Sequence, residues 1–199
     1  MPQKNKNKKE SDNWLLPIEE VESTTFQTIN GAHPAMIDDE ALLKGVVFDF
    51  GRTGGPGGQH RNRKATACTA THSATSVSGT ASERRRQSEN RKLSISRLRK
   101  KLAIQLRRNI DLKKYIMSEL WEERRNGQQL LINPKHRDYP HILAETLDVL
   151  HACNLDLSRA AEILQISSTQ LLKILSHEKA ALTLINHSRK EQGLHPLKA

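Results

Sequence analysis

The sequence has few aromatic residues, few cysteines and no long apolar segment. Aromatic side chains make up 4% of the 199 residues, and the apolar fraction of 36% is low for one large core, so we expect small cores. Two cysteines are too few for a disulfide framework and favour a reducing compartment. No apolar run approaches the roughly 18–20 residues of a membrane-spanning helix. We therefore expect a cytoplasmic chain with no membrane partner.

Acidic residues are nearly absent from residues 52–108. This segment carries fifteen Lys and Arg against two Glu, a net charge of +13, whereas the whole chain carries +10. Residues 11–51 are acidic, and residues 109–199 are almost neutral, with twelve bases against eleven acids. A solvated surface normally mixes both signs, so the bias indicates a polyanionic partner. Because aromatic residues are rare, phosphate contact is a simpler account than base stacking.

The hydrophobic patterns predict an α+β chain whose C-terminal part is helical. The apolar run in residues 41–50 is typical of a strand. The Thr-, Ser- and Val-rich residues 64–79 predict one or two short strands with a turn near residues 73–76. Further along, helices are predicted over residues 84–108, 112–125, 141–154, 157–165 and 167–193, the last with a break near His177 and an end at Gly193.

Most of the glycine in the central region lies in residues 51–64, which read GRTGGPGGQHRNRK. The spacing fits neither a phosphate-binding P-loop nor a dinucleotide-binding fingerprint. Glycines on both sides of Pro56 allow a backbone to approach a ligand closely, with its amides free to donate. Gln59 offers a neutral amide, and the bases that follow it can hold phosphates. Composition alone favours a flexible surface loop.

The order of residues in this segment resembles the GGQ loop of class I peptide chain release factors and their ribosome-rescue relatives. The resemblance covers roughly residues 45–108. It continues through a Thr-His pair and turn, matched by Thr71, His72 and Thr75, and through a helix start, matched by Arg85, Gln87 and Asn90. The sequence departs from the family pattern at Arg61, Ala74, Ser76 and Arg86, which leaves the tip itself intact.

The resemblance implies a ribosome-dependent hydrolysis of the ester that joins peptide to tRNA. In this family the loop enters the peptidyl transferase centre of the large ribosomal subunit, and ribosomal RNA and the substrate's own hydroxyl are thought to do the work of a base. No cofactor or metal is implied. The implied catalytic residues are Gly57, Gly58 and Gln59. The bases expected to bind ribosomal RNA are Arg52, Arg61, Arg63, Lys64, Arg84, Arg85, Arg86 and Arg91, and the bases further along the same helix, Arg97, Arg99, Lys100, Arg107 and Arg108, are expected to touch it as well.

Composition and the resemblance together divide the chain into parts. We expect a disordered basic arm over residues 1–12, a GGQ domain with its following helix over residues 13–126, and a helical module over residues 127–199. A codon-reading release factor carries a further domain before the GGQ domain, and no Pro-x-Thr or Ser-Pro-Phe tripeptide occurs here. We therefore expect a monomeric, codon-independent member that acts on peptidyl-tRNA in ribosome rescue. The alternative is a non-catalytic RNA- or ribosome-binding protein.

Residues 154–176 resemble the helix-turn-helix of bacterial DNA-binding proteins. Ser158 is the expected N-cap of the first helix, and Gln165 stands in the turn where glycine is common. The second helix carries a single base, Lys173, whereas a DNA reader usually needs more positive charge. We therefore favour a helical bundle that docks on the ribosome or on the GGQ domain over a DNA-binding regulator.

Histidine and cysteine residues do not fall into a recognised zinc spacing. Cys68 and His72 lie four positions apart on a predicted strand and so share a face, but packing is favoured over metal ligation. His60 adjoins the tip, and a spacing or hydrogen-bonding role is favoured over that of a general base.

Overall fold

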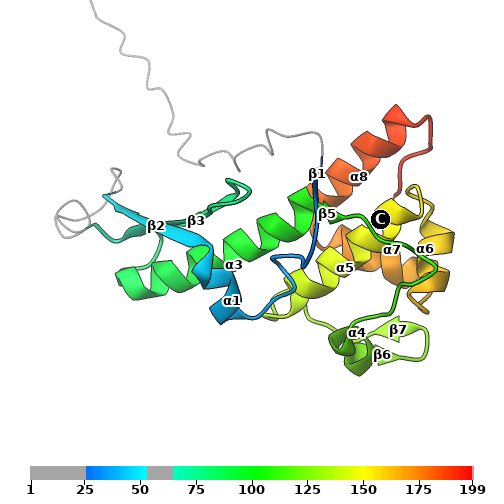
Figure 1. The fold of residues 1–199 in the computed structure, drawn as a ribbon, viewed down its shortest axis with the longest axis horizontal. Coiled ribbons are helices and arrows are strands. Elements are labelled where there is room, and N and C mark those ends of the chain that lie inside the picture. Colours follow the sequence, from blue (N-terminus) through cyan, green and yellow to red (C-terminus); the bar gives the residue numbers. More distant parts are fainter. Residues whose placement is uncertain (1–25, 53–64, 199) are drawn as a thin grey trace, which may run out of the picture.

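The computed structural model describes residues 26–52 and 65–198. Figure 1 shows a three-stranded sheet at one end of the molecule, a group of helices at the other, and the long helix α3 running between them. This confirms the predicted α+β fold with a helical C-terminal part. The helices are α1 (Asp39–Lys44), α3 (Gln87–Gln105), α4 (Glu119–Arg124), α5 (Tyr139–Ala152), α6 (Leu157–Ile163), α7 (Ser168–Ser176) and α8 (Lys179–Glu191). The strands are β1 (Gln27–Ile29), β2 (Val46–Gly51), β3 (Ala67–His72), β4 (Ser78–Ala81), β5 (Leu106–Arg108), β6 (Arg125–Asn126) and β7 (Gln129–Leu130).

The three-stranded sheet is antiparallel in the order β2-β3-β4. Its strands confirm the predicted hairpin, and the turn between β3 and β4 lies at residues 73–76, as expected. The strand predicted within residues 41–50 is confirmed as β2, whereas residues 41–44 belong to α1. Asp38 caps that helix, because its side chain accepts a hydrogen bond of 2.7 Å from the Ala41 N–H.

Helix α3 lies very close to the sheet, because the strand residues that face it are small. Buried Ala70, Cys68 and Ala81 leave room for the helix. At Gly79 the approach is closest: a Cβ there would lie 2.3 Å from the Leu98 nitrogen and 2.5 Å from the Ser94 oxygen. Any larger residue at this position would push the helix away from the sheet.

Helix α3 ends earlier than predicted. It stops at Gln105, and β5 then pairs in parallel with β1, with Leu106 opposite Gln27. The Arg107 side chain is fully buried and donates to the carbonyls of Ala103 at 2.9 Å, Ile104 at 2.7 Å and Leu106. Its guanidinium therefore satisfies carbonyls at the end of α3, and burial lowers its pKa to about 9.

The helix predicted over residues 112–125 is also shorter in the structure, where α4 begins at Glu119. The preceding residues are held by a buried carboxylate on α5 instead of by helical hydrogen bonds. Glu145 accepts from the Tyr115 hydroxyl at 2.6 Å, the Ser118 N–H at 2.8 Å and the Ser118 hydroxyl at 2.5 Å. Ser118 then caps α4 by accepting from the Trp121 N–H.

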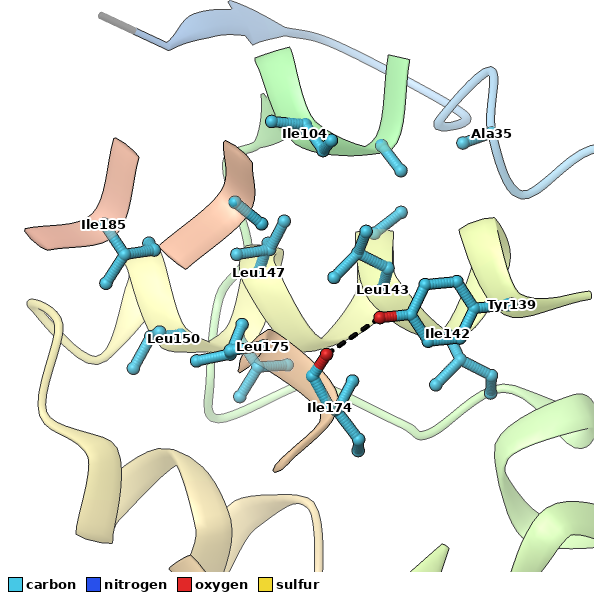
Figure 2. Packing of buried hydrophobic residues seen from close by; sticks show 14 of the residues in the cluster. Ala35, Ile104, Tyr139, Ile142, Leu143, Leu147, Leu150, Ile174, Leu175 and Ile185 are labelled. Carbon is cyan, nitrogen blue, oxygen red and sulfur yellow. Dashed lines mark hydrogen bonds between the residues drawn. The ribbon is translucent and has the colours of Figure 1, made fainter. Parts of the chain in front are cut away.

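The C-terminal helices pack around α5, which is buried along most of its length. Figure 2 shows Leu143, Leu147 and Leu150 of α5 among side chains from the neighbouring segments. The Tyr139 hydroxyl donates to the Ile174 carbonyl at 2.8 Å and so ties α5 to α7. The predicted break near His177 and the end at Gly193, where φ is +71°, are confirmed. Across the described residues, none of the helices has the length and apolar character that a membrane span requires.

Candidate functional site

The candidate site is the connection between β2 and β3, which contains the glycine-rich segment. The strands pair from Val46 opposite His72 to Gly51 opposite Ala67. Both ends of the connection therefore leave the same end of one hairpin. The predicted catalytic residues Gly57, Gly58 and Gln59 lie outside the described residues, as do the predicted RNA-binding residues Arg61, Arg63 and Lys64 and the basic arm.

Two side chains from the first turn of α3 hold the C-terminal end of this connection. The Gln87 amide donates to the Ala65 carbonyl at 2.9 Å, and the Asn90 amide donates to the Thr66 carbonyl at 2.7 Å. Both donors match the family's pattern at the start of this helix, but the sequence does not show what they bind. The resemblance marked the two positions, and the structure supplies their partners.

The predicted RNA-binding run, residues 84–86, lies directly before α3. All three arginines are exposed. The neighbouring carboxylate of Glu83 is engaged elsewhere, because it accepts hydrogen bonds from both Nη1, at 3.2 Å, and Nη2 of Arg97. Partial burial opposes ionisation of Glu83, but the backbone hydrogen bonds and Arg97 lower its pKa overall. The positive charge of residues 84–86 therefore faces solvent and is not neutralised by Glu83.

Two further predicted RNA-binding residues lie at the end of β2 and against the sheet. Arg52 directly follows β2 and is exposed. The Arg91 guanidinium carbon, from α3, lies 4.2 Å from the centroid of the Phe48 ring, a cation–π contact that holds the side chain against the sheet. Phe48 in turn stacks on Phe50. The structure therefore leaves both arginines beside the sheet that carries the glycine-rich connection.

Not all bases of the +13 segment form this surface, because several of those expected to touch RNA between residues 99 and 108 are buried or paired within the protein. Arg107 is fully buried. Arg99 is largely buried, pairs with Asp39 at 2.7 Å and donates to the carbonyls of Ala35 and Ile37. Lys100 pairs with Glu178, and Arg108 pairs with buried Asp148 at 2.7 Å. These bases stabilise the fold, because they pair with acids and carbonyls of the C-terminal and N-terminal segments.

The Thr-His pair and the cysteine of β3 have packing contacts. His72 Nδ1 lies 2.8 Å from the Thr75 hydroxyl, which closes the turn before β4. Burial lowers the pKa of His72. Cys68 is buried and accepts a hydrogen bond from the Ser94 hydroxyl at 3.3 Å. Among residues 26–52 and 65–198, no group of three His, Cys, Asp or Glu side chains could hold a metal ion.

Helices α6 and α7 adopt a helix-turn-helix arrangement. Gln165, in the turn, has a φ of +53°, the conformation for which glycine is common. Asp156 caps α6, which corrects the prediction of Ser158; its side chain accepts from the Ser158 and Arg159 N–H groups. A larger departure from DNA-binding modules is that α4 packs over the turn. The Trp121 indole of α4 donates to the Leu164 carbonyl at 3.1 Å.

The start of α7 is also covered. The Ser167 N–H donates to the carbonyl of Gln128, in the β6–β7 hairpin, at 3.0 Å. In DNA-binding proteins the N-terminal residues of the equivalent helix contact base edges. Here they contact the protein's own hairpin, and α5 packs against α3. This geometry favours the predicted bundle docked on the rest of the chain.

In a comparison with known protein families, a single family model covers the three-stranded sheet, α3 and the segment after α3. Residues 39–137 match the model of the RF-1 domain. The match begins at α1 and ends two residues before α5. A search of curated proteins finds no significant match to the chain.

Proposed function

Because residues 39–137 belong to the RF-1 domain family, the GGQ domain of class I release factors, we propose that this chain hydrolyses peptidyl-tRNA on the ribosome. The family supports a release-factor-like function in translation. The finer proposal is that the chain acts without reading a codon and releases peptides from stalled ribosomes. The observation that carries the proposed hydrolysis is the intact Gly57-Gly58-Gln59 sequence in the connection between two paired strands.

The proposed chemistry needs a hydrogen-bond donor where negative charge develops in acyl transfer. The backbone N–H of Gln59 is such a donor, and a preorganised donor stabilises the transition state. Gly57 and Gly58 permit the backbone shape and leave room beside the tRNA end. The Gln59 side chain positions water. His60 spaces the tip and does not act as the base, which ribosomal RNA and the substrate hydroxyl supply.

Binding is proposed to rest on phosphate contacts by exposed arginines. Arg52, Arg91 and residues 84–86 lie beside the sheet from which the connection emerges. Arg61, Arg63 and Lys64 follow the tip in the sequence and add to the same charge. Neutralising several phosphates gives strong, salt-sensitive binding without base recognition. We therefore propose that the large ribosomal subunit is the main partner of a monomeric chain.

Codon independence is supported by what the chain contains after the RF-1 domain. Residues 139–191 form a packed helical bundle, and the sequence has no codon-reading tripeptide. The bundle carries little net charge, and its helix-turn-helix is covered by α4 and the β6–β7 hairpin. These features support a structural or docking role for the bundle over reading of mRNA or DNA.

The test is single-turnover peptide release by tip variants. Gly58→Ala adds a Cβ that displaces the Gln59 N–H, and loss of one such donor costs about 3 kcal/mol, roughly a hundredfold in rate or more. Gln59→Ala keeps the backbone N–H and should do less harm. His60→Ala should be mildest and should keep any pH dependence near about pH 6.5, where a histidine base would titrate.

Ribosome binding, measured in parallel, is the control. We expect Gly58→Ala to bind ribosomes as the wild type does. Wild-type release by Gly58→Ala would contradict the proposal for the tip. Equal inactivity of the wild type and Gly58→Ala, with intact binding, would favour the non-catalytic ribosome-binding protein instead. If His60→Ala were the most damaging change, the assignment of the base to ribosomal RNA and substrate would be wrong.

A further inference from the structure

The C-terminal end of the glycine-rich connection is held by side chains rather than by the sheet. The paired register of β2 and β3 ends at Ala67, so Ala65 and Thr66 lie beyond the ladder. Their carbonyls accept hydrogen bonds from Gln87 at 2.9 Å and Asn90 at 2.7 Å. The first turn of α3 therefore fixes the two residues that lead out of the connection into β3.

Asn90 also holds the basic run. Its side-chain oxygen accepts from the Arg84 N–H at 2.8 Å, and its amide nitrogen donates to the Arg84 carbonyl at 2.9 Å. The same nitrogen donates to Thr66, so one amide joins the end of the connection to the first arginine of residues 84–86. Asn90 is fully buried.

The burial of Asn90 makes this link specific. The amide uses both of its donor hydrogens on carbonyls and its oxygen on an N–H, so no other side chain of the same shape can replace it. An aspartate would place a carboxylate oxygen against the carbonyls of Thr66 and Arg84. A buried polar atom that loses its partner is costly, and hydrogen-bonded networks in the interior fix a single geometry.

We propose that Gln87 and Asn90 are positioning residues that couple ribosome binding to placement of the loop. Phosphate contacts made by residues 84–86 hold Arg84, Asn90 transmits that position to Thr66, and Gln87 fixes Ala65. The basic run therefore sets where the connection returns from the reaction site, in addition to supplying affinity. This inference rests on the proposed peptidyl-tRNA hydrolysis, because that reaction gives the position of the loop its functional consequence.

Gln87→Glu tests the coupling, because a carboxylate cannot donate to the Ala65 carbonyl and the exposed side chain leaves no cavity. Ser88→Glu is the matched control, since it adds the same charge at the next exposed position of α3. We expect Gln87→Glu to lower the single-turnover release rate at saturating protein roughly five- to tenfold, the effect of one hydrogen bond. Both variants should weaken ribosome affinity equally through their charge.

The proposal is overturned if the two variants lower the saturating rate equally, or if Gln87→Glu changes affinity alone. Thermal unfolding of both variants should match the wild type, which separates positioning from stability. Gln87→Asn, which keeps a donor on a shorter side chain, should recover part of the lost rate. A wild-type rate for Gln87→Glu, or a rate for Gln87→Asn as low as that of Gln87→Glu, would exclude Gln87 from positioning.

Amide hydrogen exchange tests the link without relying on release. In the free protein, Gln87→Glu should speed exchange across residues 65–67, and Asn90→Asp should speed it there and at Arg84 together; Ser88→Glu should change neither. If exchange at residues 65–67 matches the wild type in both variants, the positioning proposal fails. If the wild-type protein releases no peptide but the exchange pattern holds, the proposed function fails while the link between Arg84 and Thr66 stands.

Discussion

The end of the molecule that carries the glycine-rich connection and the end formed by α5–α8 differ in what they bury and what they expose. Around β2, β3 and β4 the buried strand residues are small, and the exposed ones include the arginines before α3. Around α5 many of the buried residues are leucine and isoleucine, and residues 109–199 carry almost no net charge. The first region is built to present a charged surface, and the second supplies most of the apolar core.

Helix α3 belongs to both regions and shows how they are joined. Its first turns expose Arg91 and hold the connection through Asn90, whereas its last turns bury Leu98, Leu102 and Ile104. Its apolar end packs against α5. The arginines of the charged surface are therefore fixed by a helix whose own position depends on the helical core. This division predicts that stability and activity respond to different substitutions.

Leu147→Ala should have the largest effect on stability, because the side chain is fully buried in the helical core. Leucine-to-alanine changes of this kind cost about 2–5 kcal/mol. Leu131→Ala is the matched control, since Leu131 is 56% exposed and its truncation leaves no cavity. Urea unfolding measures the loss of unfolding free energy in each of the two variants. Below its melting temperature, Leu147→Ala should release peptide at the wild-type rate; a lost rate in the folded variant would break the division between the regions.

His33→Asn should change the pH dependence of stability. Burial lowers the pKa of His33 to about 3, whereas an unfolded histidine titrates near about 6.5. Between these values the unfolded chain binds a proton that the folded chain does not, so acid destabilises the wild type. This contribution is about 2 kcal/mol between pH 7 and pH 5.

The asparagine variant lacks that titration, so its free energy of unfolding should fall by about 2 kcal/mol less over the same pH interval. Urea unfolding at the two pH values measures the difference between the proteins, which removes the contributions of the other histidines. Parallel pH dependences would show that His33 takes up its proton in the folded state. The Ala35 N–H donates to His33 Nδ1 at 3.0 Å, and asparagine offers an oxygen in its place.

Replacing Arg84, Arg85 and Arg86 by alanine should have the smallest effect on the fold and a clear effect on ribosome affinity. If each arginine contacts a phosphate, the slope of log affinity against log salt should fall by about 2–3. Unfolding should be nearly unchanged, because the side chains are exposed. A slope equal to that of the wild type would remove the run from the binding surface. The double variant Lys113→Ala/Lys114→Ala, outside this surface, is the control.

Local patterns were enough to predict the hairpin, the turn after His72 and most of the C-terminal helices. The hairpin follows from the strand-forming residues 64–79, and the helices follow from the spacing of apolar residues and from Gly193 at the end of the last one. Local patterns could not predict the parallel pairing of Gln27 with Leu106, which joins distant segments. They also wrongly predicted a helix through residues 112–117, because the hydrogen bond from Tyr115 to Glu145 is a tertiary contact that local patterns do not show. In residues 112–117 the hydrogen bonds to Glu145 outweigh helix propensity.

The candidate site was predictable to a similar degree. Sequence order identified the glycine-rich segment and the exposed arginines beside it. It assigned Arg107 to RNA contact, whereas the side chain is buried over the end of α3, because charge alone does not reveal burial. It marked Gln87 and Asn90 as positions of the family pattern, but their hydrogen bonds to Ala65 and Thr66 become visible only when α3 lies against the hairpin.

The most direct test of the account is peptide release by the wild-type protein from purified ribosomes stalled with a stop codon, with a sense codon or with an empty decoding site. The single-turnover rate at saturating protein is the quantity to measure. The account predicts release in all three cases, with no strong stimulation by the stop codon. Release that requires a stop codon would contradict codon independence, and no release from any of the three complexes would contradict peptidyl-tRNA hydrolysis.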